Sequence, residues 1–293
     1  MNFWEALPIL QNGIIATIII AFMCSYLGVF VVLKRMVFMT VALSQVSSLG
    51  IAIAIPIQTW IWGNIFMISS SNPSTFIDVF PTIIAMFFSC LAAFIMAHQY
   101  SEKKITRECL LGIGYVISAA LVMLIIDLTD SSMHDINDLF FGNTVFVPTI
   151  YLLVLTAVTL IVFLINILLY KEFVFISFDP ETAKALGLNT IMFSHLLFYS
   201  LALMISVSIS TIGLLPVFSF MVIPAVAALM LEKTLKQTFI FAVLFGVTSA
   251  MLGYYLSFQF ALPTGPTIIV MTLLSFIPGF ILRSTFMSRL PEH

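Results

Sequence analysis

Apolar residues fill long runs along nearly the whole 293-residue chain, and short polar segments separate these runs. Each run approaches the roughly 20 residues that an α-helix needs to cross the hydrocarbon core of a bilayer. Only helices and closed barrels satisfy their backbone polar groups there, and these runs have the length of helices. The pattern predicts an all-α polytopic membrane helix bundle that forms one transmembrane domain over residues 1–293. We expect nine spans, at 13–33, 37–57, 77–97, 109–127, 146–170, 191–212, 214–231, 237–259 and 264–284.

Positive charges occupy every second segment between the expected spans. Lys and Arg accumulate in the cytoplasmic loops of membrane proteins. With the N-terminus outside and the C-terminus inside, all eleven positive residues lie in the cytoplasm, whereas the external segments carry mainly acids. The positive residues are Lys34, Arg35, Lys103, Lys104, Arg107, Lys171, Lys184, Lys233, Lys236, Arg283 and Arg289. The external segments hold Asp78, Asp127, Asp130, His134, Asp135 and Asp138.

The composition points to membrane lipid as the surrounding medium. Hydrophobic residues make up 61% of the chain and charged residues 8%, against about 25% charged residues in soluble domains. A net charge of -2 without a basic cluster argues against nucleic acid as a partner. Cys24, Cys90 and Cys109 are odd in number and widely spaced, so we expect packing residues rather than disulfides or a zinc site.

A short polar segment near 171–190 has the signals of a small helix. Asp179 is a good N-cap, Pro180 suits the first helical position, Glu181 favours the positive end of the helix dipole, and Gly187 supplies a stop. A helix too short to cross the membrane can transmit force from a docked protein, although an ordinary capped loop helix has the same signals. The chain lacks a G-x-x-x-x-G-K-[ST] phosphate loop, so we expect any ATP to be hydrolysed by a partner.

Five groups of residues occur together in the order found in one transporter family. Taken with the span pattern, the chain resembles the metal permeases of ATP-binding-cassette importers (the ABC-3 type), which carry zinc, manganese or iron(II) into bacteria. The groups are residues 27–36 with Ala42, Leu43, Ser44 and Gly50; Asp135 with Phe141, Gly142 and Asn143; Phe178, Asp179, Pro180 and Glu181 with Ala183, Ala185, Leu186 and Gly187; residues 212–215 with Ile223, Pro224 and Ala225; and residues 262–266.

The resemblance implies a transport subunit rather than an enzyme, located in the bacterial plasma (inner) membrane. It implies a homodimer or paired permease, two cytoplasmic ATPase subunits that bind ATP, and an external solute-binding protein that delivers the metal ion. The chain itself is expected to hold no cofactor. The ATPases would dock on the segment that contains Asp179, Pro180, Glu181, Ala183 and Gly187, and Asp135 and Asn143 would lie near the external entrance.

The second expected span departs from the family pattern. The family usually has an Asp and a His one helical turn apart, as candidate metal ligands, where this chain has Val41 and Gln45. Zinc, manganese and iron(II) favour imidazole or carboxylate over a neutral amide, so the metal ligands remain unknown. We expect the polar stripe to face the protein interior, either lining the translocation pathway or holding helices together. The pathway residues are Thr40, Ser44, Gln45 and Ser48.

Three other functions remain open at this point. The loss of the Asp and His fits an importer of a different cargo, such as a chelated metal or a small organic molecule. An ATP-independent secondary transporter or channel is a further alternative, but such proteins usually carry ionisable residues within their spans. The expected spans hold almost no residue of this kind beyond His195, which lies near one end of a span. A purely structural membrane scaffold is the remaining possibility.

Overall fold

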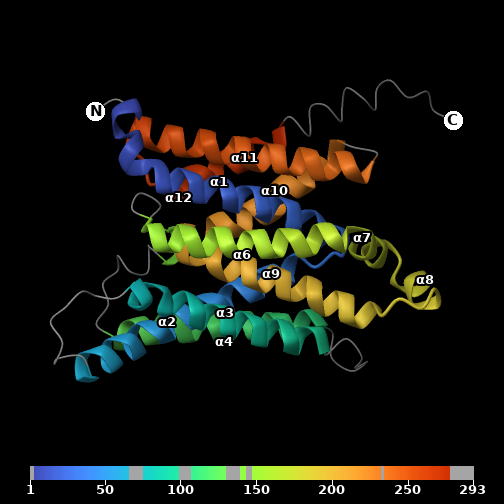
Figure 1. The fold of residues 1–293 in the computed structure, drawn as a ribbon, viewed down its shortest axis with the longest axis horizontal. Coiled ribbons are helices and arrows are strands. Elements are labelled where there is room, and N and C mark those ends of the chain that lie inside the picture. The colour runs from blue at the N-terminus through green and yellow to red at the C-terminus, as the bar shows by residue number, and fades with distance from the viewer. Residues whose placement is uncertain are drawn as a thin grey trace.

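A computed structural model of the chain describes residues 3–65, 75–98, 107–129, 139–142, 147–231 and 234–277. The described residues are almost entirely helical, and Figure 1 shows the helices running roughly parallel and antiparallel to one another. The helices are α1 (Phe3–Leu33), α2 (Val37–Ile65), α3 (Thr75–His98), α4 (Arg107–Leu128), α6 (Thr149–Leu168), α7 (Tyr170–Phe178), α8 (Pro180–Ala185), α9 (Thr190–Ile212), α10 (Leu214–Leu231), α11 (Leu235–Phe260) and α12 (Thr264–Leu274).

Eight of the described helices are long and apolar enough to cross a membrane, which confirms the all-helical membrane fold. They are α1 to α4, α6 and α9 to α11, and they match the first eight expected spans to within a few residues at most ends. Helix α1 begins earlier and α2 ends later than expected, and the two helices continue past Pro8 and Pro56. The fifth span ends at Leu168 rather than at residue 170, and the chain re-enters a helix as α7.

The ninth expected span begins where predicted but is shorter in the described residues. Helix α12 starts at Thr264 and ends at Leu274, which gives 11 residues and a length of only about 16 Å at 1.5 Å per residue. The Ser275 hydroxyl donates to the carbonyl of Thr272 at 2.6 Å. The chain is helical again at residues 276 and 277. Residues 278–284 of the expected span lie outside the described residues.

The helices form two groups with α9 between them (Figure 1). One group contains α1, α10, α11 and α12, and the other contains α2, α3 and α4. Helix α9 packs against α3 and α2 on one side and against α6 and α1 on the other. Helix α8 immediately precedes α9 in the chain and is therefore joined to a helix that contacts both groups.

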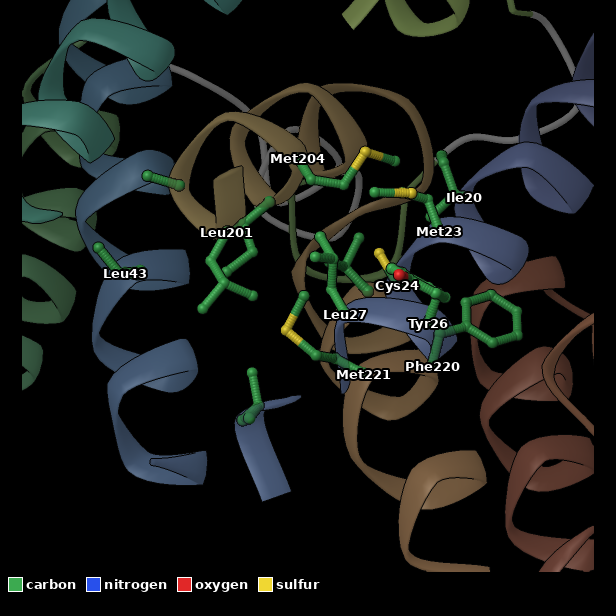
Figure 2. Packing of buried hydrophobic residues seen from close by; sticks show 14 of the residues in the cluster. Ile20, Met23, Cys24, Tyr26, Leu27, Leu43, Leu201, Met204, Phe220 and Met221 are labelled. Carbon is green, nitrogen blue, oxygen red and sulfur yellow. The ribbon is translucent and has the colours of Figure 1, made fainter. Parts of the chain in front are cut away.

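The core of the bundle forms where α1, α9 and α10 meet. Figure 2 shows Met23 and Leu27 of α1 beside Leu201 and Met204 of α9, and all four side chains are fully buried. Helices α1 and α10 approach at backbone distance, since a Cβ built on Gly28 would lie 1.9 Å from the carbonyl oxygen of Met221. Small residues permit such approach between membrane helices, where van der Waals contact drives association.

The helices differ greatly in how much of their surface the chain itself covers. Within the apolar window of each helix, 72% of the residues of α1 are buried but only 17% of those of α6. Helix α4 is similarly exposed and presents large apolar side chains such as Val116 and Leu124. In a membrane protein such faces contact lipid tails or another membrane-spanning surface.

Candidate translocation and coupling sites

The polar stripe of α2 is buried inside the chain, which confirms its expected orientation. Thr40, Ser44, Gln45 and Ser48 are each at most 3% exposed. Helix α2 packs against α3, α4 and α9, and to a smaller extent against α10. The stripe therefore lies within the helix bundle rather than at its lipid-exposed surface.

Hydrogen bonding divides this stripe into two pairs. The hydroxyls of Thr40 and Ser44 donate to carbonyls of their own helix, those of Val37 at 2.7 Å and Val41 at 2.8 Å. In contrast, the side-chain oxygens of Gln45 and Ser48 are buried without a hydrogen-bond partner. An unsatisfied buried polar group costs about 1–3 kcal/mol, so such groups call for a ligand, a water or another conformation. Gln45 and Ser48 are about one helical turn apart, so their two oxygens without a partner lie on the same face of α2, which also contains Val41.

A second set of buried oxygens without a hydrogen-bond partner lies between α2 and α3, and its members on α3, Thr82 and Ser89, were not anticipated from the sequence. A Cβ on Gly50 of α2 would lie 2.8 Å from the Cα of Ala85 of α3, so the two backbones nearly touch. Ser47 shares a helix face with Gly50, and Thr82 and Ser89 share one with Ala85. All three hydroxyl oxygens are buried without a partner. Scattered Ser and Thr in apolar runs carry little signal, because such residues occur at any helix contact.

One cavity lies beside the stripe but is not part of it. It has a volume of about 330 Å³ and is formed by α2, α3 and α4. Val46 of α2 contributes to its wall, and the other lining residues are apolar or glycine. None of Thr40, Ser44, Gln45 and Ser48 lines it. The cavity therefore offers no metal ligands.

The described residues contain no group of three or more His, Cys, Asp or Glu side chains that could hold a metal ion. His195 packs near the rings of Phe94 and Tyr199, with ring centres 6.1 and 6.3 Å apart. Asp127, at the end of α4, is exposed. The entrance residues expected from the family pattern, Asp135 and Asn143, lie outside the described residues.

The expected short helix is present as α8. The side chain of Asp179 accepts hydrogen bonds from the backbone N–H of Thr182 at 3.0 Å and from its hydroxyl at 2.5 Å. These bonds lower the pKa of the Asp179 carboxyl below its usual value. Pro180 takes the first helical position, and Gly187 ends the helix at φ +82°. The N–H of Leu188 then donates to the carbonyl of Ala183, which completes a Schellman motif.

Helix α8 is exposed on nearly every side. Ala183 is fully buried and anchors it, whereas Pro180 and Glu181 are exposed. Two large apolar side chains flank the helix and are also exposed, Phe178 at 55% and Leu186 at 69%. A polar, capped helix bordered by exposed apolar side chains has the composition of a protein docking surface.

Three glycines from distant parts of the chain meet at the other end of α9. A Cβ on Gly142 would lie 2.2 Å from the carbonyl carbon of Ile212, and one on Gly213 would lie 2.4 Å from the backbone nitrogen of Gly142. A Cβ on Gly265 would lie 2.1 Å from the carbonyl oxygen of Phe141. Gly142 and Gly213 also have positive φ, at +74° and +82°. We call this contact of Gly142, Gly213 and Gly265 the glycine junction.

The glycine junction brings together three of the five residue groups that carry the family pattern. A model of the ABC 3 transport family matches residues 6–283 of the chain. The chain belongs to this family. It is a multi-pass membrane transport subunit and not a catalytic enzyme, and permeases of this family work with ATPase subunits and a solute-binding protein.

Curated relatives of this permease have names that refer to different metals. The manganese transport system membrane protein MntC of Listeria monocytogenes is 27% identical over 96% of this chain and 94% of its own length. The high-affinity zinc uptake system membrane protein ZnuB of Buchnera aphidicola is 27% identical over 89% and 93%. The chelated iron transport system membrane protein YfeD of Yersinia pestis is 25% identical over 94% and 86%.

The fold also matches a solved structure, that of PsaBC from Streptococcus pneumoniae in complex with Fab. The permease superimposes on it with a TM-score of 0.80 at 23% sequence identity, covering 98% of this chain and 99% of that one. At this identity the match shows that the two chains share a fold.

Proposed function

We propose that this permease imports a divalent transition metal ion, zinc, manganese or iron(II), by alternating access driven by ATPase subunits. Membership of the ABC 3 transport family over residues 6–283 is the observation that carries the proposal. The names of the relatives add the cargo class, since they refer to manganese, zinc and chelated iron. The distribution of Lys and Arg supports the orientation, with the N-terminus outside and the C-terminus in the cytoplasm of a bacterium.

In this proposal the whole chain acts as one transmembrane domain, paired with a second copy of itself in the inner membrane. The coupling segment near 171–190 receives the ATPase, and α8 with Asp179, Pro180, Glu181, Ala183 and Gly187 forms its centre. The exposure of Phe178 and Leu186 supports this role, because docking would cover apolar side chains that otherwise face water. An external binding protein delivers the metal near Asp135 and Asn143.

The cargo passes along α2, beside Thr40, Ser44, Gln45 and Ser48. The hydroxyls of Thr40 and Ser44 donate hydrogen bonds to backbone carbonyls. Their oxygens can therefore still accept, and can face a cation. Gln45 and Ser48 offer oxygens that have no partner in the closed bundle. These neutral ligands hold a metal ion weakly. A transport pathway requires sites weak enough to release the ion, and such ligands satisfy that requirement.

The test is ATP-dependent uptake by the permease, its ATPase and its binding protein reconstituted in lipid vesicles. Zinc, manganese and iron(II) are supplied separately on the binding-protein side. Uptake of at least one metal that stops without ATP supports the proposal. ATP hydrolysis stimulated by the binding protein, without accumulation of any of the three, would rule out free metal as cargo.

A pair of variants tests the pathway itself. Replacing Val41 and Gln45 together (Val41→Asp with Gln45→His) restores the ligands typical of the family, one turn apart on α2. We expect the double variant to retain metal ions measurably in the nucleotide-free complex and to move them more slowly, because imidazole and carboxylate bind these metals more tightly than an amide does. Gln58→His also replaces a glutamine of α2 by histidine, but away from the stripe, and is the matched control. Equal metal retention in both variants would place the pathway elsewhere.

A metal chelate is the second candidate cargo. The absence of Asp and His at Val41 and Gln45 favours it, because a chelator fills the coordination sphere that the protein would otherwise supply. The relative from Yersinia pestis is named for chelated iron. Uptake of a metal that requires a chelator in the vesicle assay, and fails with the free ion, would establish this alternative.

A further inference from the structure

The turn between α1 and α2 is closed by two backbone hydrogen bonds. The N–H of Met36 donates to the carbonyl of Val31 at 2.9 Å, and the N–H of Arg35 donates to that of Val32 at 3.0 Å. These two bonds form a Schellman motif, in which Arg35 has φ +54°, a conformation that residues other than glycine seldom adopt. Helix α2 begins one residue later, at Val37. The direction of α2 is therefore set by the end of α1.

The Lys34 side chain connects this turn to α9. Its Nζ donates to the hydroxyl of Ser194 at 3.2 Å and lies 5.7 Å from the centre of the Phe198 ring. Ser194 and Phe198 are one turn apart on the same face of α9. The ammonium group thus bridges two adjacent helical turns, by a hydrogen bond to one residue and a cation–π contact with the other.

The segment of α9 that Lys34 contacts follows α8 directly. Asn189 caps α9, with its side chain accepting from the N–H of Met192 at 3.1 Å. The four residues between the helices, 186–189, are held as well, because the N–H of Leu188 donates to the carbonyl of Ala183 and the N–H of Thr190 to that of Leu188. A displacement of α8 therefore moves the first turns of α9 instead of being absorbed by a loose linker.

An aromatic contact strengthens the same connection. The ring of Phe173, in α7, lies 6.1 Å from that of Phe30 in α1 and 6.5 Å from that of Phe193 in α9, both in edge-to-face orientation. Phe30 and Phe173 are fully buried. The segments on both sides of α8 thus contact the end of α1, through Phe173 before it and through Ser194 and Phe198 after it.

We infer that Lys34 is a positioning residue for transport, which passes the displacement of α8 to the polar stripe of α2. We call Lys34 with Ser194 and Phe198 the Lys34 clasp. Thr40 lies six residues after Lys34 in the chain and Gln45 about one and a half helical turns further on. The inference rests on the proposed function, since it assumes that an ATPase acts on α8 and that α2 lines the pathway.

The experiment uses the permease with its ATPase and binding protein in lipid. Cys24, Cys90 and Cys109 are replaced by Ala, and Gln45→Cys reports access to the stripe through its reaction with a charged thiol reagent, with and without ATP. Lys34→Met keeps the apolar stem and removes the charge, Ser194→Ala removes the hydrogen bond alone, and Lys236→Met is the control. Lys236 is an exposed lysine at the start of α11.

We expect ATP to change the labelling rate in the parent and in Lys236→Met. In Lys34→Met the ATP-dependent change should shrink about fivefold or more, the lower end of typical coupling between sites, with a smaller loss in Ser194→Ala. The melting temperature, the amount of bound ATPase and the rate of ATP hydrolysis should stay close to those of the parent. Metal transported per ATP hydrolysed should fall in parallel.

Three results would overturn the inference. An unchanged response in Lys34→Met would exclude Lys34 from coupling while leaving the proposed function intact. A parallel loss of melting temperature and bound ATPase in Lys34→Met, with a normal response in the milder Ser194→Ala, would make Lys34 a structural clamp only. A parent complex whose labelling at position 45 ignores ATP would place the gated pathway away from α2 and overturn the inference, while the vesicle uptake assay decides the proposed transport function separately.

Discussion

The two ends of α9 are joined to the rest of the bundle in different ways. At its start, the Lys34 clasp joins α9 to the α1–α2 turn through one long side chain and a ring. At its end, the glycine junction joins three backbone segments with no room for a Cβ atom. A lysine has four rotatable side-chain bonds and keeps a contact while the helices shift, whereas backbones within van der Waals distance permit little relative movement.

This difference indicates where movement can occur. A permease that alternates between two access states needs one region that keeps its helices in register and another that can slide. The glycine junction fits the first role. The start of α9 with the exposed helix α8 fits the second, and the Lys34 clasp keeps this moving end joined to the α1–α2 turn. The structure thus separates a fixed end from an adjustable one along a single helix, and four changes test that separation.

The largest effect is expected from Gly142→Ala. The new methyl group would overlap the backbone of Ile212, and the residue would have to hold a φ of +74°. Overpacking costs typically about 1–3 kcal/mol, and a left-handed conformation about 1–2 kcal/mol more for a residue with a Cβ. We expect a marked loss of folded protein, measured by yield and melting temperature in detergent. Gly114→Ala, where nothing lies within 4 Å of the new atom, should have no such effect.

Gly187→Ala should cost less, although its φ of +82° is equally positive. No atom lies within 4 Å of an added Cβ there, so the cost is confined to the left-handed conformation, about 1–2 kcal/mol, and to the C-terminal cap of α8. We expect the bundle to keep its melting temperature while the amount of co-purified ATPase falls. A loss of melting temperature as large as that of Gly142→Ala would contradict the distinction between the two ends.

Asp179→Ala should act on α8 alone. It removes the carboxylate that caps the helix through Thr182, so the first turn of α8 should fray. The expected result is faster hydrogen exchange of the backbone amides of residues 181–185 and weaker ATPase retention, with the bundle unchanged. Asp127→Ala, at an exposed position that ends α4, serves as the matched control. Retention reduced equally by both variants would point to a general charge effect.

The smallest expected effect is that of pH on the α8 cap. The pKa of Asp179 is lower in the folded chain than in the unfolded one, so the cap contributes its full stability above the unfolded pKa of about 3.9. The contribution is lost as the pH falls through the lower, folded pKa. Protection of the Thr182 amide, corrected for intrinsic exchange, should therefore stay constant from pH 8 to pH 5. A decline over that range would show that Asp179 is not the group that holds the cap.

Local signals predicted much of the molecule. The run lengths predicted nine spans, and eight of them are long apolar helices in the described residues, because the bilayer imposes a similar length on every span. The residues around Asp179 and Gly187 predicted α8, since caps act within a few residues along the chain. Counting apolar residues also predicted where the ninth span begins, at Thr264, whereas residues 278–284 of that span lie outside the described residues.

By itself the sequence determined the class of protein, the position of eight long helices, the buried stripe on α2 and the short capped helix, because apolar length, residue type and caps act locally. Only the tertiary structure decided that Gln45 and Ser48 keep open oxygens while Thr40 and Ser44 do not. It also decided that Lys34 meets Ser194, 160 positions away, and that three glycines converge. The physical reason is that these contacts depend on how helices cross in space, which no local pattern of side chains specifies.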